Sequence, residues 1–102
     1  MLASDGRIFS GTNVENTSYG LTVCAERVAI FKGVSEGLKE VKAIAVVSTG
    51  PKEAYPCGAC RQVIHEFGKS SMVILEHKGK SRRIFLKDLL PHAFELSRKI
   101  RR

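Results

Sequence analysis

Three cysteines constrain this chain more than any other feature, because each lies at the start of a predicted helix. They are Cys24, Cys57 and Cys60. An odd number of cysteines without a secretion signal argues against a disulfide framework and favours metal binding or catalysis. A Cys-x-x-Cys pair at a helix start places both sulfurs beside backbone N–H groups that lower thiol pKa values. Taken alone, Cys57 and Cys60 fit either redox chemistry or a structural zinc site.

The third cysteine, Cys24, separates these readings. A structural zinc site uses four protein ligands, whereas a catalytic site uses three and leaves one position for water. The histidines His65, His77 and His92 lie on other faces or in later elements. We interpret them as ordinary surface or partly buried residues. The simplest count is therefore three thiolates and one open position.

Charged residues follow the cysteines closely. Glu26 comes two residues after Cys24, where its carboxylate can exchange a proton with a zinc-bound water. The plainer alternative is a first-turn glutamate that complements the helix dipole. Zinc with three thiolates and a hydroxide carries net negative charge, so compensation is needed. Arg27 and Arg61 each follow a site residue, and we expect one or both to donate hydrogen bonds to the ligand sulfurs.

Strand and helix signals alternate along the 102 residues, which predicts an α/β fold in one domain. An Asp5-Gly6 turn indicates a hairpin, and an apolar run ending at Val47 is typical of a strand buried on both faces. The predicted elements are a strand end at 1–3, a strand at 7–11, a helix at 23–38, a strand at 41–47, a helix at 60–67, strands at 72–75 and 83–86 around a turn at 78–80, and a helix at 92–100 introduced by Pro91.

The net charge of +7 is concentrated at the carboxyl end, where residues 98–102 contain four lysines and arginines. We interpret the basic segment 95–102 as the solvated end of a helix and not as a nucleic-acid contact. No apolar run approaches the ~20 residues needed to cross a bilayer. The first residues carry no secretion signal. The sequence therefore predicts a soluble cytoplasmic protein without a membrane partner.

Three segments carry a family resemblance. Residues 11–30 (GTNVENTSYGLTVCAERVAI), 56–67 (PCGACRQVIHEF) and 89–94 (LLPHAF) resemble the cytidine deaminases that act on free nucleosides. The resemblance covers residues 5 to 94. It implies a three-layer α-β-α fold with a mixed sheet, over a single zinc domain of residues 1–102. The family begins with a helix and a full first strand, so we expect this chain to begin near the end of that strand.

The resemblance also implies an activity: cytidine or deoxycytidine is hydrolysed to uridine or deoxyuridine and ammonia, in pyrimidine salvage. The three cysteines would hold one Zn²⁺ per subunit of a homotetramer, and Glu26 would shuttle the proton. It implies that Asn13 and Glu15 bind the ribose hydroxyls and that the backbone around Ala25 contacts the base. Phe94 would close over the base, from its own or a neighbouring subunit.

Other interpretations remain open at this point. Blasticidin-type deaminases share the CAE and PCxxCRQ elements, although the run from Asn13 to Asn16 is more typical of cytidine deaminases. A truncated, non-catalytic paralogue could retain zinc for folding and serve as an assembly or binding module. A redox dithiol protein or a nucleic-acid binder is less favoured, because it gives no role to Cys24 and Glu26.

Overall fold

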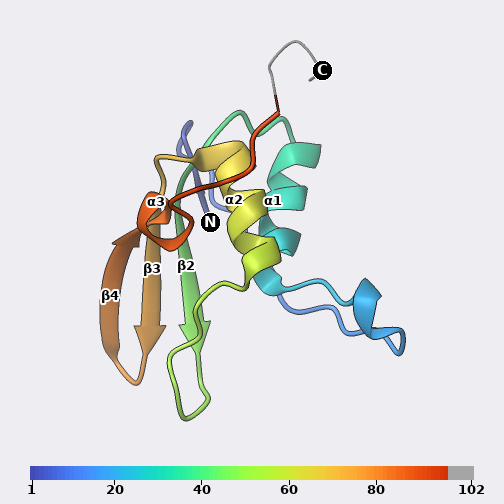
Figure 1. The fold of residues 1–102 in the computed structure, drawn as a ribbon, viewed down its shortest axis with the longest axis vertical. Coiled ribbons are helices and arrows are strands. Elements are labelled where there is room, and N and C mark those ends of the chain that lie inside the picture. The colour runs from blue at the N-terminus through green and yellow to red at the C-terminus, as the bar shows by residue number, and fades with distance from the viewer. Residues whose placement is uncertain (97–102) are drawn as a thin grey trace.

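The structure, a computed structural model, describes residues 1–96 (Figure 1). Its helices and strands alternate along the chain, as the sequence predicts. In chain order they are β1 (Leu2–Ala3), the 3-10 helix η1 (Tyr19–Leu21), α1 (Ala25–Ser35), β2 (Val41–Ser48), α2 (Gly58–Gly68), β3 (Met72–His77), β4 (Lys80–Phe85) and the one-turn helix α3 (Leu86–Leu89). No helix among the described residues is long and apolar enough to cross a membrane.

The four strands form one mixed sheet in the order β1-β2-β3-β4. β2 and β3 run parallel, with Ile44 opposite Val73, and the two outer pairs are antiparallel. Parallel neighbours need a crossover connection, which α2 supplies. β3 and β4 are joined by a turn in which Lys78 and Gly79 both have positive φ, the geometry that matches strand twist in a two-residue hairpin. The predicted α/β class and mixed sheet are confirmed.

Buried side chains alternate along the central strands. Ile44, Val73 and Leu75 are at most 2% exposed and share one face of the sheet. The helices cover this face, since α1 packs on α2 and β2, while α2 also packs on β2 and α3. Ile30 from α1 and Ile64 from α2 join the same core. Burial of each such side chain contributes roughly 1.5–3 kcal/mol to folding.

The opposite face of β2 is more open than the sequence predicts. Ala45 and Val47 alternate with the core residues and are exposed, Val47 by 69%. The expectation of a strand buried on both faces is therefore wrong for residues 1–96. Within this part of the chain the helices form one layer on the sheet, so two of the three expected layers are described.

Both long helices begin at a cysteine. Cys24 is the N-cap of α1 and Cys57 is the N-cap of α2, and the two helices begin at the same end of the molecule (Figure 1). Gly37, with φ +89°, follows the end of α1 and confirms the predicted stop. At Gly68 an added Cβ would lie 2.4 Å from the Val41 carbonyl oxygen, so α2 ends directly against β2. This close packing at Gly68 fixes the end of α2 on the sheet.

The predicted N-terminal hairpin forms but is short. Met1 and Phe9 exchange backbone hydrogen bonds of 2.8 and 2.9 Å, and Gly6 occupies the turn with φ +93°. Only Ile8 of the predicted strand at 7–11 forms a bridge, to Leu2. Beyond Ile8 the chain leaves the sheet, and Gly11 lies against the backbone of α1.

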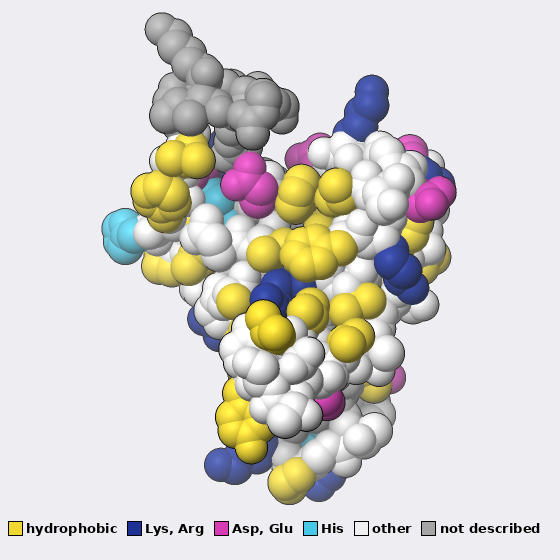
Figure 2. All heavy atoms as spheres, turned by 90° about the vertical axis from the view of Figure 1, so that its right-hand side faces the viewer, with side chains coloured by type: hydrophobic (Ala, Val, Ile, Leu, Met, Phe, Trp, Pro, Cys, Tyr) yellow, Lys and Arg dark blue, Asp and Glu magenta, His cyan; other side chains and the backbone are white. Residues whose placement is uncertain are grey.

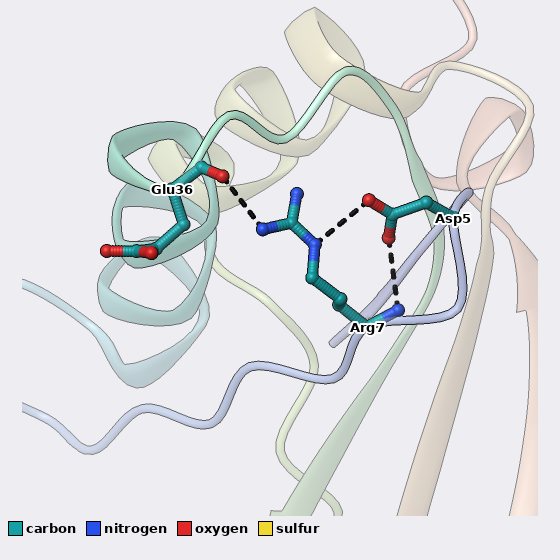
Figure 3. A network of polar contacts seen from close by, with 3 residues as sticks. All are labelled: Asp5, Arg7 and Glu36. Atoms are coloured by element: carbon teal, nitrogen blue, oxygen red, sulfur yellow. Dashed lines mark hydrogen bonds and ion pairs between the residues drawn. The ribbon is translucent and has the colours of Figure 1, made fainter.

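Arg7 ties this hairpin to the end of α1 (Figure 3). Its backbone N–H and Nε donate to the Asp5 carboxylate at 3.1 and 2.9 Å, and its Nη1 donates to the Glu36 carbonyl at 2.8 Å. The hydrogen bond from the Arg7 backbone lowers the pKa of Asp5. A cation at a helix C-terminus complements the helix dipole. The hairpin is thereby held in a defined position beside α1.

The predicted C-terminal helix is wrong where the structure describes it. Residues 92–96 are not helical, and the rest of the predicted helix, at 97–100, lies outside the described residues. The chain instead makes one helical turn earlier, with the Leu90 N–H donating to the Leu86 carbonyl. After Pro91, side chains of α2 hydrogen-bond the segment, and these bonds replace those that a helix would make.

Candidate metal centre and active site

The three cysteines converge where α1 and α2 begin. Their Sγ atoms all lie within 4.8 Å of one another, and those of Cys24 and Cys57 are 3.9 Å apart. Cys57 accepts a hydrogen bond from the Cys60 N–H at 3.5 Å, which caps α2 with the sulfur itself. Residues 33 positions apart in sequence are thus brought to one point by two helix starts.

The spacing of the sulfurs fits a tetrahedral zinc ion. With Zn–S bonds of about 2.3 Å, ligand sulfurs of a tetrahedron lie about 3.8 Å apart. The group contains three side chains, and no described histidine belongs to it. His65 instead contacts Glu95, and His77 contacts the Gly50 carbonyl. Three soft thiolates with a fourth position free are the donor set of a catalytic zinc site.

The surroundings of Cys60 are electrostatically unfavourable for a thiolate. Burial raises the pKa of this thiol to about 12, helped by its hydrogen bond with Cys57 and by the nearby charge of Glu26. By contrast, the Cys60 backbone N–H lowers the pKa of Cys57. A divalent cation would stabilise three thiolates in this place, because its charge offsets the cost of burying theirs.

Glu26 lies in the first turn of α1, half-buried. Its charge acts on the Cys60 thiol, although Cys60 belongs to α2, so its carboxylate lies within electrostatic range of the cluster. Glu26 is not one of the grouped sulfur donors. The structure therefore brings the three cysteines together and places Glu26, which the sequence also singled out, within electrostatic range of them.

The two arginines behave differently. Nη2 of Arg27 lies 3.8 Å from Cys24 Sγ and 3.3 Å from the Thr22 carbonyl. The contact with Cys24 raises the pKa of Arg27. Arg61 instead donates from Nε to the Pro56 carbonyl at 2.8 Å. Arg27 thus contacts a ligand sulfur directly, whereas Arg61 braces the backbone that precedes Cys57.

This difference gives a testable prediction. Arg27→Ala is expected to weaken zinc affinity by about 10- to 100-fold, because it removes a hydrogen-bonding cation from a ligand sulfur. Arg61→Ala should have a smaller effect, since its bonds go to carbonyl groups. Competition with a chromogenic chelator measures both affinities. Equal affinities in Arg27→Ala and the wild-type chain would contradict the role given to Arg27.

The loop before Cys24 is tied to the start of α1. Asn13 Oδ1 accepts a hydrogen bond from the Ala25 N–H at 2.8 Å, which satisfies one of the free donors of the first turn. Val14 and Val23 exchange two backbone bonds that hold the loop closed. Glu15, between these anchors, is exposed. The loop therefore presents Asn13 and Glu15 next to the helix start that carries Cys24.

Gly11 allows this close approach. A Cβ at Gly11 would lie 2.4 Å from the Ala25 carbonyl oxygen and 2.7 Å from the Ala29 nitrogen, both backbone atoms that cannot move aside. Gly11→Ala is therefore expected to push the loop off α1, to break the bond between Asn13 and Ala25, and to destabilise the fold by about 1–3 kcal/mol. Thermal unfolding measures this. Gly20→Ala is the control, because nothing lies within 4 Å of its added Cβ.

The comparisons with known proteins agree with this geometry. Residues 1–76 match the family described as the cytidine and deoxycytidylate deaminase zinc-binding region. The chain belongs to this family. A cytidine deaminase of Sporosarcina psychrophila is 48% identical over 96 residues, which cover 92% of this chain and 71% of that protein. The cytidine deaminase structure from Burkholderia pseudomallei matches with a TM-score of 0.85 at 45% identity, covering 91% and 76% of the two chains.

A more distant relative within the same comparisons is a blasticidin-S deaminase of Bacillus cereus. It is 31% identical over 94 residues, which cover 84% of this chain and 67% of that protein. The identity is lower than for the cytidine deaminases named above. Family membership also makes zinc the metal of the three-cysteine cluster, since the matched region is a zinc-binding one.

In this deaminase-family chain the predicted substrate contact Phe94 lies far in sequence from the loop residues Asn13 and Glu15. It belongs to the segment after α3, its side chain is 69% exposed, and its carbonyl oxygen accepts a hydrogen bond from Gln62 Nε2 at 2.9 Å. Sequence reasoning missed Gln62 and Thr22. Thr22 accepts from the Asn16 N–H and also bonds Arg27 through its carbonyl. Both residues lie within the segments 11–30 and 56–67 that carry the resemblance, which was the only signal available in the sequence.

Proposed function

We propose that this chain is a zinc-dependent deaminase of cytidine and deoxycytidine, built as a single zinc domain over residues 1–102. The observation that carries the proposal is the cluster of three sulfurs with Glu26 beside it, at the start of α1. Its relatives named as cytidine deaminases support the choice of substrate. The overall reaction adds water to the base and releases ammonia, so that a C4–O bond forms and the C4–N4 bond breaks.

Zinc held by the three cysteines would supply a nucleophile at neutral pH. Glu26 would accept a proton from the attacking water and deliver it to the base and to the departing amino group. The half-buried position of the carboxylate suits this role, because water competes less with the transfer. Arg27 offsets the charge of the ligand sulfurs, and Arg61 steadies the backbone before Cys57.

The nucleoside is held by groups around the first turn of α1. Asn13 and Glu15 bind the ribose hydroxyls from the loop, and the backbone around Ala25 contacts the base. The bond between Asn13 and the Ala25 N–H supports this assignment, because it fixes the loop relative to the helix that carries Glu26. Phe94 contributes an aromatic face for the base.

We further propose a homo-oligomer, a tetramer, in which a second copy covers the outer face of α1. Figure 2 shows apolar side chains gathered on the side of the molecule where this helix lies. A shallow groove of about 380 Å³ there is lined by Val14, Val23, Val28 and Phe31, with Lys32 and Ser35 at its edge. Phe31 is 48% exposed and Val14 is 51% exposed. Apolar surface of this kind marks interaction sites. Light scattering after gel filtration tests the oligomer, and a monomer would contradict it.

The reaction itself is tested on one purified sample. Zinc content and the absorbance change of cytidine on conversion to uridine are measured together, with deoxycytidine and blasticidin S as parallel substrates. Stoichiometric zinc with turnover of cytidine supports the proposed reaction, which would serve pyrimidine salvage. Zinc without turnover would favour the non-catalytic paralogue, and preferential turnover of blasticidin S would favour the other deaminase class.

A further inference from the structure

The segment after α3 is attached to one face of α2 by side chains. Gln62 Nε2 donates to the Phe94 carbonyl at 2.9 Å, and His65 Nε2 lies 2.8 Å from Glu95 Oε2. Lys69 Nζ is 3.9 Å from the same carboxylate oxygen. Gln62, His65 and Lys69 follow one another at intervals of three and four residues, so they lie along one side of α2. The neighbouring residues Phe94 and Glu95 are therefore held by side chains from neighbouring turns of α2.

A further bond fixes the segment from its other end. Arg61 Nη1 donates to the Leu89 carbonyl at 3.0 Å, where α3 ends. The residues from 89 to 95 thus have anchors on both sides of Phe94 and one on Phe94 itself. The contacting atoms of the segment are two carbonyl oxygens and a carboxylate. Its path is therefore set by polar contacts from α2, without a regular element of its own.

Burial is distributed unevenly within this attachment. The His65 side chain is only 12% exposed, whereas the Glu95 side chain that it contacts is 49% exposed. The Phe94 side chain, whose backbone is held, remains 69% exposed. An aromatic ring that stays uncovered on an anchored backbone loses little further conformational entropy when it stacks on a ligand. The arrangement holds the backbone and leaves the ring available.

We propose that Gln62 and His65 are positioning residues, which hold Phe94 where its ring stacks on the base of the bound nucleoside. This inference rests on the proposed function. Neither residue touches the reacting atoms; both act through Phe94 by fixing residues 94 and 95 on α2. The expected consequence is an effect on nucleoside binding and little effect on the chemical step, because Glu26 and the three cysteines are untouched.

The test compares Gln62→Ala, His65→Ala and Glu95→Ala with the wild-type zinc-loaded chain. Each variant is expected to raise KM for cytidine by about 2- to 10-fold, the effect of losing one hydrogen bond, while kcat and zinc content change little. Glu95→Ala removes the pair from its exposed side, so it keeps the test valid if His65→Ala misfolds. His92→Ala is the matched control, since it removes an exposed histidine of the same segment and should leave KM unchanged.

A double-variant cycle separates positioning from a general structural role. In a Phe94→Ala background, adding Gln62→Ala should raise KM no further, because the ring that Gln62 holds in place is gone. An equal rise in both backgrounds would overturn the inference, as would unchanged KM in all three single variants. In those cases wild-type turnover of cytidine leaves the proposed function intact. Failure of the wild-type chain to turn over cytidine would overturn the proposed function and this inference together.

Discussion

Glu26→Gln is expected to keep one zinc per chain and to lower kcat for cytidine by about 10³-fold. The amide keeps the size of the side chain but does not take up a proton at neutral pH. General acid–base groups typically raise the rate by roughly 10²- to 10⁴-fold. Zinc retention is expected because the three sulfurs form the metal group without Glu26. Metal analysis and steady-state kinetics on the same sample measure both effects.

Glu36→Gln provides the matched control, at the other end of α1. Its side chain is exposed, and its contact with Arg7 uses only the backbone carbonyl. The control should therefore retain wild-type kcat and stability. If Glu26→Gln turned over cytidine as fast as the wild-type chain, the proton-shuttle mechanism would be wrong. If it lost zinc, Glu26 would have to be reassigned as a residue that supports the metal.

The helices and central strands were predictable because their signals are local and periodic. Helical spacing with Gly37 at its end predicted α1, and the apolar run ending at Val47 predicted β2. The exposure of Val47 was not predictable from that run. Whether an apolar residue is covered depends on what packs against its face of the sheet, and a continuous run carries no information about that.

The C-terminal segment illustrates the opposite case. Its sequence favours a helix after Pro91, yet the described part is irregular. Gln62 and His65 are about 30 residues away in sequence and hold this segment by its carbonyl and carboxylate groups. Tertiary contacts of this kind override local propensity. No periodicity within residues 92–96 could have revealed them.

The candidate site was more predictable than the segment, since its residues cluster in two short motifs. Cys24 and Cys57 each occupy the N-cap position of a helix, so two local predictions placed both sulfurs at helix starts. The two sulfurs lie 3.9 Å apart because α1 packs on α2, and this packing cannot be predicted from either motif alone. The partner of Arg61 was unpredictable for the same reason. The sequence does not distinguish its bond to the Pro56 carbonyl from a bond to a ligand sulfur.

Cys24→Ala and Cys57→Ala are each expected to abolish zinc binding and to lower Tm substantially. Two thiols remain in either variant, fewer than the three protein ligands of a catalytic zinc site. Metal binding contributes to folding stability because the unfolded chain has no preformed site. Cys60 is avoided as the primary test, since it is fully buried and its truncation would also leave a cavity. Metal analysis and thermal unfolding measure the two effects.

The chelated wild-type chain is the decisive comparison for these variants. If zinc supplies the stability, wild-type protein treated with a strong chelator should approach the Tm of Cys24→Ala, and added zinc should restore only the wild-type chain. The free energy of unfolding of Cys57→Ala should be about 1 kcal/mol lower than that of Cys24→Ala, because Cys57 Sγ also caps α2. Ala59→Ser changes the same exposed turn without removing a sulfur and should keep its zinc. Full zinc occupancy in either cysteine variant would contradict a three-thiolate site, because the metal would then need another ligand.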